Sequence, residues 1–123
     1  MPALYSETLL DHFRHPRNYG DLPAADISYE SFNPLCGDRI RIAVKLNDRV
    51  VQDARFKGDG CAISTAAASL LTEMIRGATL ESLSSLPDDH LISALESNIQ
   101  PARIQCALLP LEALRSGLKD YQG

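Results

Sequence analysis

The chain has 123 residues, of which 45% are hydrophobic, and it carries a formal net charge of −4 at pH 7. This length predicts one domain, residues 1–123, with one core that needs no disulfide bonds. The negative charge argues against nucleic acids and anionic membranes as partners. No apolar run approaches the roughly 20 residues of a membrane span and the first residues lack a signal-peptide pattern, so we expect a cytoplasmic location.

The first predicted element is a short amphipathic helix over residues 4–14. It ends at His15, because the residue before a proline avoids helical backbone conformations. His12 and His15 could act as metal ligands, but no cysteine or second motif lies near them in the sequence. We therefore interpret both, together with His90 in a later helix, as polar surface residues.

An antiparallel hairpin is the clearest pattern in the chain. Residues 39–46 alternate between apolar and polar side chains, which is typical of a half-buried strand. Asn47 and Asp48 are expected to form the turn, and residues 50–57 return as the second strand. A shorter strand is predicted before the hairpin, at residues 27–32.

The connection between the first strand and the hairpin contains the first cysteine. Pro34 and Gly37 bracket Cys36 in a turn, and Asp38 follows two residues after Cys36. Across a turn these two side chains can converge. Because aspartate is common in turns, this C-x-D pattern alone is weak evidence for a site.

Cys61 stands at the start of the most apolar predicted helix. Gly58 and Gly60 mark a tight loop, and residues 62–74 are rich in alanine and leucine, which indicates a buried central helix. A thiol at a helix start lies beside unpaired N–H groups and the positive end of the helix dipole, which favour the thiolate. Taken alone, the stretch also fits a small buried cysteine without chemistry. Hairpin geometry predicts that Cys36 and Cys61 are close, since the start of one strand lies beside the end of the other.

The last third of the chain is predicted to be helical. Short helices are expected over residues 79–83 and from Pro87 to Leu95, and a longer one is expected to end near Tyr121. Cys106 opens this last helix after a turn that contains a proline. Pro110 is expected within the first turn or so, where a missing N–H costs little.

All three cysteines thus lie in a turn or at a helix start. Three is an odd and sparse number, which favours reduced or metal-binding thiols over a disulfide framework. Their spacings of 25 and 45 residues match no zinc finger. The residues alone therefore predict only a possible metal site.

Four segments carry a resemblance to a known family. They are Tyr5-Ser6-x3-Leu10-Asp11-His12-Phe13-Arg14-x-Pro16-Arg17-Asn18, Cys36-Gly37-Asp38, Gly60-Cys61-x2-Ser64 and Pro101-x-Arg103-x2-Cys106. In this order they resemble the U-type iron–sulfur assembly proteins, namely IscU, SufU and the N-terminal domain of NifU. The resemblance covers nearly the whole chain.

The resemblance implies an α+β fold with a three-stranded antiparallel sheet and helices packed on one side. It also implies a shallow metal site at one end, with Cys36, Asp38, Cys61 and Cys106 as ligands of a transient [2Fe–2S] cluster or of Zn²⁺. The three cysteines are then candidate acceptors of persulfide sulfur. The implied partners are a cysteine desulfurase, which supplies the sulfur, and apo-proteins, which receive the cluster.

Two departures from the family pattern affect this interpretation. IscU-type members carry a histidine immediately before the third cysteine, where this chain has Gln105, a poor metal ligand. They also carry a Leu-Pro-Pro-Val-Lys-type segment that a dedicated Hsp70 chaperone reads. Here residues 99–103 read Ile-Gln-Pro-Ala-Arg, which gives no basis for predicting that chaperone as a partner. The segments around Cys36 and Arg103 look more like SufU, but the chain lacks the insertion that SufU proteins have between the second and third cysteines.

Three functions are therefore compared. The first is an iron–sulfur scaffold, the second a zinc-bound sulfur acceptor that stimulates a cysteine desulfurase, and the third a small interaction domain with unligated cysteines. Three thiolates, one carboxylate and a divalent metal would leave a net charge of −2. We expect basic residues near such a site, with Arg103, Arg39 and Lys57 as candidates.

Overall fold

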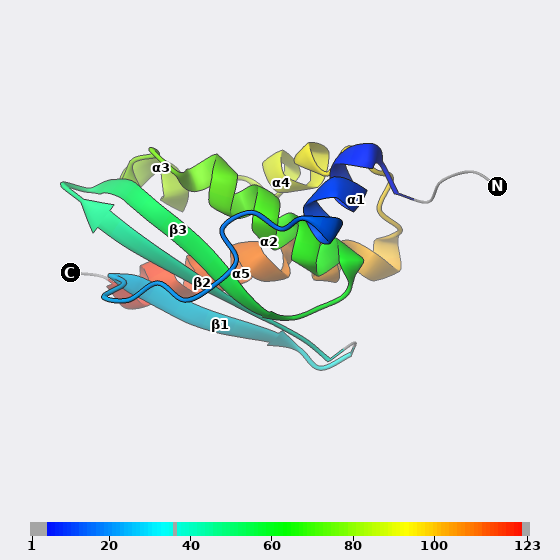
Figure 1. Cartoon of the computed structure of the whole chain (residues 1–123), viewed down its shortest axis with the longest axis horizontal. Helices are drawn as coiled ribbons and strands as arrows, with labels where there is room; N and C mark the ends of the chain where they lie inside the picture. Colours follow the sequence, from blue (N-terminus) through cyan, green and yellow to red (C-terminus); the bar gives the residue numbers. More distant parts are fainter. Residues whose placement is uncertain (1–4, 36, 122–123) are drawn as a thin grey trace.

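The computed structural model describes residues 5–35 and 37–121, and its elements follow a simple order (Figure 1). They are α1 (Glu7–Arg14), β1 (Ile27–Asn33), β2 (Asp38–Asn47), β3 (Val50–Asp59), α2 (Ala62–Ile75), α3 (Leu80–Ser84), α4 (Asp88–Ala94), the 3-10 turn η1 (Pro101–Arg103) and α5 (Ile104–Tyr121). The strands form one antiparallel sheet in the order β1-β2-β3. The predicted α+β fold, with helices on one side of a three-stranded sheet, is confirmed.

The hairpin of β2 and β3 determines which residues meet at the end of the sheet. Asp48 and Arg49 both have positive φ angles, of 55° and 65°, which gives the tight turn that suits the twist of a two-residue hairpin. The turn therefore lies one residue later than predicted. At the opposite end, Arg39 at the start of β2 pairs with Asp59 at the end of β3. This register brings Asp38 beside the loop that leads into α2.

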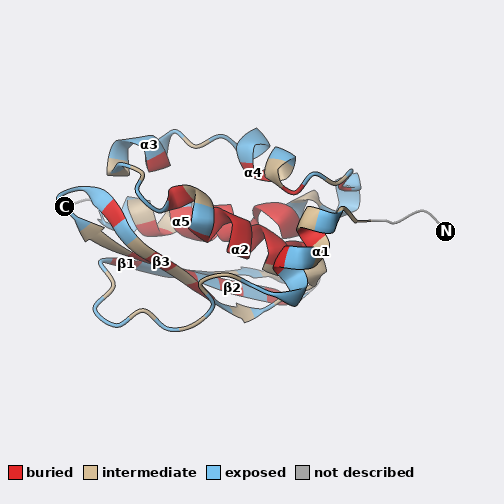
Figure 2. Ribbon diagram, turned by 45° about the horizontal axis from the view of Figure 1, so that its top comes forward, coloured by how far each residue is buried: buried red, intermediate tan, exposed pale blue. Residues whose placement is uncertain are grey.

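Two helices cover the inner face of the sheet. α2 packs over β2 and β3, while α5 packs over β1 and β2, and α1 and α4 lie outside this pair (Figure 1). Figure 2 shows that buried residues are concentrated in α2 and α5. Gly117 permits the close approach of α5 to β1, because a Cβ at this position would lie 2.7 Å from Cγ2 of Ile27. No helix in residues 5–35 or 37–121 is both long and apolar enough to cross a membrane.

Pro110 lies in the interior of α5, so its predicted position in the first turn is wrong. The helix begins at Ile104, directly after η1, and reaches Pro110 only at its seventh residue. Because the turn at residues 101–103 leads directly into α5, the helix starts earlier than the predicted start at Cys106. A proline here cannot donate a helical hydrogen bond. Pro110 is nevertheless buried in the packed interior of the domain.

The prediction that His12 is a surface residue is also wrong. Its exposed fraction is 6%, whereas His15 and His90 are exposed as expected. His12 Nδ1 lies 2.7 Å from Oγ of Ser69 on α2, and its Nε2 lies 3.5 Å from Glu73. The backbone N–H of Arg17 also donates to the Ser69 hydroxyl, which leaves that hydroxyl able to donate to a neutral His12. Burial lowers the pKa of His12, with the charge of Arg17 as a second cause.

We expect that His12→Ala destabilises the domain and leaves the predicted metal ligands in place. The loss of a buried hydrogen-bond partner for Ser69 costs about 1–3 kcal/mol of unfolding free energy. In the wild type, His12 takes up a proton at a higher pH in the unfolded chain than in the folded chain. The contribution of neutral His12 to the free energy of unfolding is therefore complete above about pH 6.5, and it is lost as the pH falls below that value. Urea unfolding between pH 5 and pH 8 measures both effects, and an unchanged pH slope in His12→Ala would contradict this role.

Candidate metal centre

Three of the four predicted ligands meet at one end of the sheet. Asp38 is the first residue of β2, Cys61 immediately precedes α2, and Cys106 lies in the first turn of α5. One carboxylate oxygen and the two Sγ atoms all lie within 4.8 Å of one another. The end concerned is the right-hand end of the sheet in Figure 1, where α2 and α5 begin. Cys36, the fourth predicted ligand, lies outside the described residues.

Asp38 is held by the start of α2. Its carboxylate accepts a hydrogen bond from the backbone N–H of Cys61 at 3.2 Å and another from the hydroxyl of Ser64 at 3.1 Å. The exposed fraction of Asp38 is only 6%. A buried carboxylate needs such donors, and the positive end of the α2 dipole stabilises it further. The position of Asp38 is therefore fixed by the same helix start that carries Cys61.

The two thiols differ in their exposure. Cys61 is half-buried, whereas Cys106 is 3% exposed and packs in the core. Cys61 occupies the N-cap position of α2 and makes no side-chain capping hydrogen bond, so its sulfur remains available for other chemistry. A half-buried thiol at a helix start is suited to act as a metal ligand or as a sulfur nucleophile.

Arg103 supplies positive charge to this site. The pKa of its guanidinium lies above the ordinary value, first because of its charge interaction with Cys61 and then because of Tyr5 and Cys106. Arg39 and Lys57, the other basic candidates, are exposed and form ion pairs with Glu30 and Asp21, at 3.4 Å and 3.3 Å. Among the three, Arg103 is thus the one with a described interaction with the thiols.

The donor atoms match a soft or borderline metal. Ligands of one tetrahedral ion with bonds of roughly 2.3 Å lie about 3.8 Å apart, so the observed separations need only a small contraction to hold Zn²⁺. Two sulfurs and one oxygen leave one position of a four-coordinate site for another ligand.

Ser64 is the functional candidate to which the sequence analysis assigned no role. It appears there only as part of the Gly60-Cys61-x2-Ser64 segment. The structure places its hydroxyl between Asp38 and Cys61, with Oγ 3.6 Å from the Cys61 sulfur. The signal in the sequence was the three-residue spacing from Cys61, which puts both residues on the first turn of one helix.

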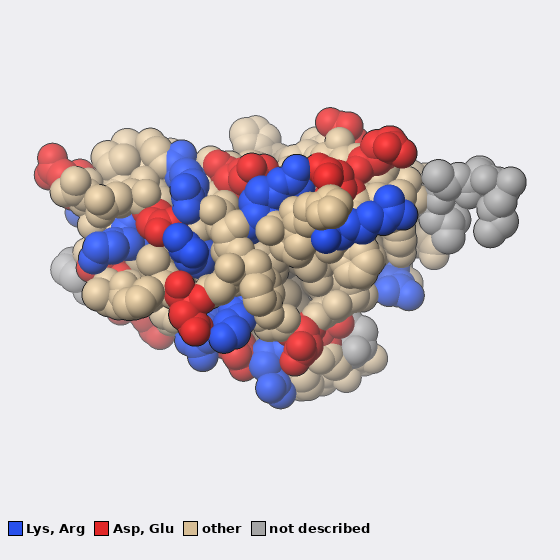
Figure 3. All heavy atoms as spheres, viewed as in Figure 1, with Lys and Arg blue, Asp and Glu red and all other residues tan. Residues whose placement is uncertain are grey.

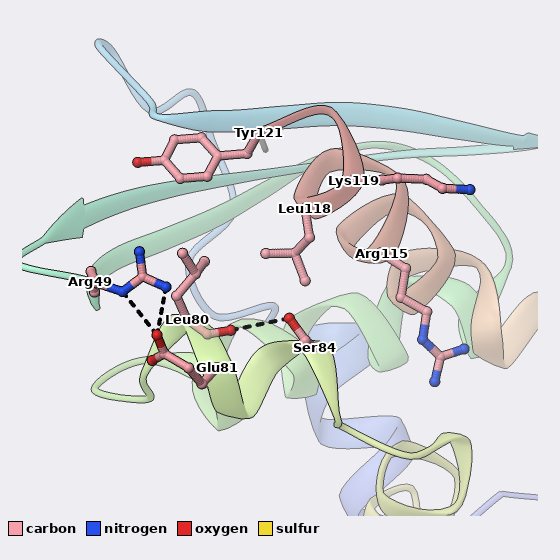
Figure 4. A pocket seen from close by; sticks show the side chains of 8 residues that line it. All are labelled: Arg49, Leu80, Glu81, Ser84, Arg115, Leu118, Lys119 and Tyr121. Carbon is pink, nitrogen blue, oxygen red and sulfur yellow. Dashed lines mark hydrogen bonds and ion pairs between the residues drawn. The ribbon is translucent and has the colours of Figure 1, made fainter. Parts of the chain in front are cut away.

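A cavity of about 600 Å³ lies far from Cys61 and Cys106, between α3 and the end of α5 (Figure 4). Its lining consists of Arg49, Leu80, Glu81, Ser84, Arg115, Leu118, Lys119 and Tyr121. Two of its three cations are already in ion pairs, Arg49 with Glu81 and Arg115 with Asp88. Of the predicted site residues that the structure describes, none lines it. Figure 3 shows acidic and basic side chains mixed across the visible face, so neither sign dominates that face.

Comparisons with known proteins show which family of proteins this chain resembles. A family model described as "NifU-like N terminal domain" matches residues 4–123. The zinc-dependent sulfurtransferase SufU of Bacillus subtilis is 38% identical over 140 aligned positions, which cover 100% of this chain and 95% of that protein. The iron–sulfur cluster assembly scaffold protein IscU of Escherichia coli K12 is 34% identical over 122 positions, which cover 96% and 94% of the two chains.

Solved structures show the same architecture. A crystal structure from Fervidobacterium islandicum AW-1, described as that of a scaffold protein for iron–sulfur cluster assembly in the SUF system, has a TM-score of 0.80 and 25% identity. The match covers 94% of this chain and 96% of that one. An N-terminal NifU-like protein from Brucella abortus, at 20% identity and a TM-score of 0.78, shares the fold. The SufU alignment is longer than this chain, so SufU of B. subtilis contains residues that have no counterpart here.

Proposed function

Because the chain belongs to the family of NifU-like N-terminal domains, we propose that it is an iron–sulfur cluster assembly scaffold. It receives sulfur from a cysteine desulfurase, builds a [2Fe–2S] cluster and transfers the cluster to apo-proteins. The observation that carries the proposal is the convergence of Asp38, Cys61 and Cys106 within 4.8 Å. Proteins named as scaffolds are 31–36% identical to this chain over nearly its whole length, which supports the same conclusion.

Cluster binding requires four protein ligands, and the chain offers them as three thiolates and one carboxylate. We assign them as Cys36, Asp38, Cys61 and Cys106. Thiolates are the ordinary ligands of iron–sulfur clusters, and a single carboxylate introduces a harder and weaker donor. A scaffold benefits from one weak ligand because its cargo must leave. Arg103 offsets part of the negative charge of the loaded site.

Sulfur transfer to this site is a thiol exchange. A cysteine thiolate of the chain attacks the terminal sulfur of the donor persulfide, and the cysteine of the donor leaves as a thiolate. Two electrons from an external thiol or electron-transfer protein then reduce the bound sulfur to the sulfide of the cluster. Of the two thiols that the structure describes, Cys61 is the acceptor that we favour, because it is half-buried while Cys106 is in the core.

A second candidate function is that of a zinc-bound sulfur acceptor for a cysteine desulfurase. The observation that favours it is the 38% identity with the zinc-dependent sulfurtransferase SufU across the whole chain. Gln105 also replaces the histidine expected beside the third cysteine in IscU-type proteins. In this case the same four ligands hold Zn²⁺, and one thiolate is released to take the persulfide sulfur.

Anaerobic purification with metal analysis, followed by reconstitution with ferrous iron and sulfide, tests the proposal. A scaffold is expected to gain two irons and two sulfides per cluster, to show the visible absorption of a [2Fe–2S] centre and to load an apo-ferredoxin. A zinc-dependent acceptor is expected to retain one zinc per chain, to form no transferable cluster and to accelerate a desulfurase. A protein that binds neither metal nor cluster would contradict both functions.

A further inference from the structure

We infer that Ser64 is a positioning residue that orients Asp38 as a metal ligand. This inference rests on the proposed function and specifies how one ligand of that site is held. Ser64 itself is not assigned as a ligand. Its hydroxyl acts on the carboxylate of Asp38, and through that carboxylate on the affinity for metal.

The burial of Ser64 leaves its hydroxyl few partners. Its exposed fraction is 0%, and it lies on the first turn of α2, three residues after Cys61. The acceptors around Oγ are Asp38 Oδ2 at 3.1 Å and the Cys61 carbonyl at 3.3 Å, and the Cys61 sulfur lies 3.6 Å away. One hydroxyl has one proton to donate. The carboxylate is the charged and nearer oxygen acceptor, so it takes the stronger hydrogen bond.

Gly60 makes room for this arrangement. A Cβ at Gly60 would lie 2.2 Å from Oγ of Ser64, so any other residue there would displace the hydroxyl. The position of the Ser64 hydroxyl, as well as the tight loop, therefore requires a glycine before Cys61. The segment Gly60-Cys61-x2-Ser64 thus forms one structural unit around the Asp38 carboxylate.

The hydrogen bonds hold Asp38 in its ligating position and leave it able to bind metal. Cys61 N–H donates to Oδ1 and Ser64 donates to Oδ2. A carboxylate has about four lone-pair sites, so two remain for a metal. With both hydrogen bonds in place, a carboxylate oxygen already lies within 4.8 Å of both thiol sulfurs. Loss of the Ser64 bond would leave Oδ2 without this anchor and would let the carboxylate rotate.

The test compares Ser64→Ala with Ser69→Ala. Ser69 is an equally buried serine on the same helix, but its hydroxyl contacts His12 and Arg17. Zinc affinity is measured by competition with a chromophoric chelator, and the ligand environment by the visible absorption of the Co²⁺-substituted protein. We expect Ser64→Ala to lower zinc affinity about tenfold, as is typical for loss of a group that orients a ligand. Ser69→Ala should change the affinity less than about twofold.

Two further variants separate orientation from general destabilisation. In the Asp38→Ala background, Ser64→Ala should cause no additional loss of zinc affinity and no further change of the Co²⁺ spectrum. Ser64→Thr retains a hydroxyl and should recover most of the affinity. If Ser64→Ala does not fold alone, all variants are measured in trimethylamine N-oxide, which favours the folded state.

The outcomes distinguish this inference from the proposed function. A wild type that binds neither zinc, cobalt nor a cluster overturns the proposed function. A wild type that binds metal, together with a Ser64→Ala variant of equal affinity and equal Co²⁺ spectrum, overturns only the role of Ser64. An equal loss of affinity from Ser64→Ala with and without Asp38 would also overturn it, since the effect would then not pass through the carboxylate.

Discussion

Replacement of Cys61 by serine is expected to abolish zinc retention and cluster assembly while the domain becomes no less stable. Serine has a similar volume, but its hydroxyl stays protonated near neutral pH and is a poor ligand for zinc or iron. Cys61 occupies the N-cap of α2 without a capping hydrogen bond, and serine is among the preferred residues at that position. The apo form of Cys61→Ser should therefore gain up to about 1 kcal/mol of unfolding free energy.

This combination of effects makes the experiment decisive. Metal content and cluster absorbance after reconstitution report the site, and urea unfolding of the apo-protein reports the fold. Ala62→Ser is the matched control, because it adds a hydroxyl to the neighbouring residue and leaves every proposed ligand in place. A Cys61→Ser protein that holds a cluster at the wild-type stoichiometry would show that Cys61 is a structural cysteine.

The sheet and the helix start at Cys61 were predictable because each depends on neighbouring residues. The alternation through Ile40, Ile42 and Val44 assigns one face of β2 to the core, and these three residues are fully buried. A hairpin then places the start of β2 beside the end of β3, whichever helices cover it. The prediction drawn from this topology was that Cys36 and Cys61 are close, and Cys36 lies outside the described residues. The contact that the structure does show at this end of the hairpin is between Asp38 and the backbone N–H of Cys61.

The environment of His12 could not be predicted in the same way, because it depends on distant residues. Its partner Ser69 lies 57 positions further along the chain. The same holds for Asn18, whose side-chain amide donates to Thr72 on α2. Residues 12–18, which carry the resemblance most densely, thus fasten α1 and the following segment to the central helix. Local patterns identified this segment as distinctive without showing that its role is structural.

The role of Ser64 was missed for a related reason. Its spacing from Cys61 puts it on the same helical turn, but only the sheet register brings Asp38 to that turn. The position of Pro110 shows that the start of a helix was also hard to predict from the sequence. The sequence indicated that α5 starts at Cys106, whereas the helix begins directly after η1 at Ile104, two residues earlier, so Pro110 lies deeper in the helix than predicted. Helix boundaries depend on the packing of the first turn as well as on the residues that favour it.

Changing Asp38 to cysteine is expected to tighten cluster binding and to slow cluster transfer. The carboxylate is the hardest donor of the proposed set, so a fourth thiolate should bind iron more strongly. We expect the rate of transfer to an apo-ferredoxin to fall at least about tenfold, which corresponds to about 1.4 kcal/mol of added stabilisation. The apo-protein should lose about 1–3 kcal/mol of stability, because the Cys61 N–H and the Ser64 hydroxyl lose their carboxylate acceptor.

A transfer time course under strict anaerobiosis measures this effect, with each variant loaded to the same iron and sulfide content. Asp120→Cys is the control, since it adds a thiol near the far end of α5, fourteen residues beyond Cys106 and about 21 Å along the helix axis. It should transfer its cluster at the wild-type rate. Asp38→Ala provides the opposite change, an open coordination position from which zinc should exchange faster. If Asp38→Cys also transfers at the wild-type rate, the lability of the cargo does not come from the carboxylate, and Asp38 only supports the start of α2.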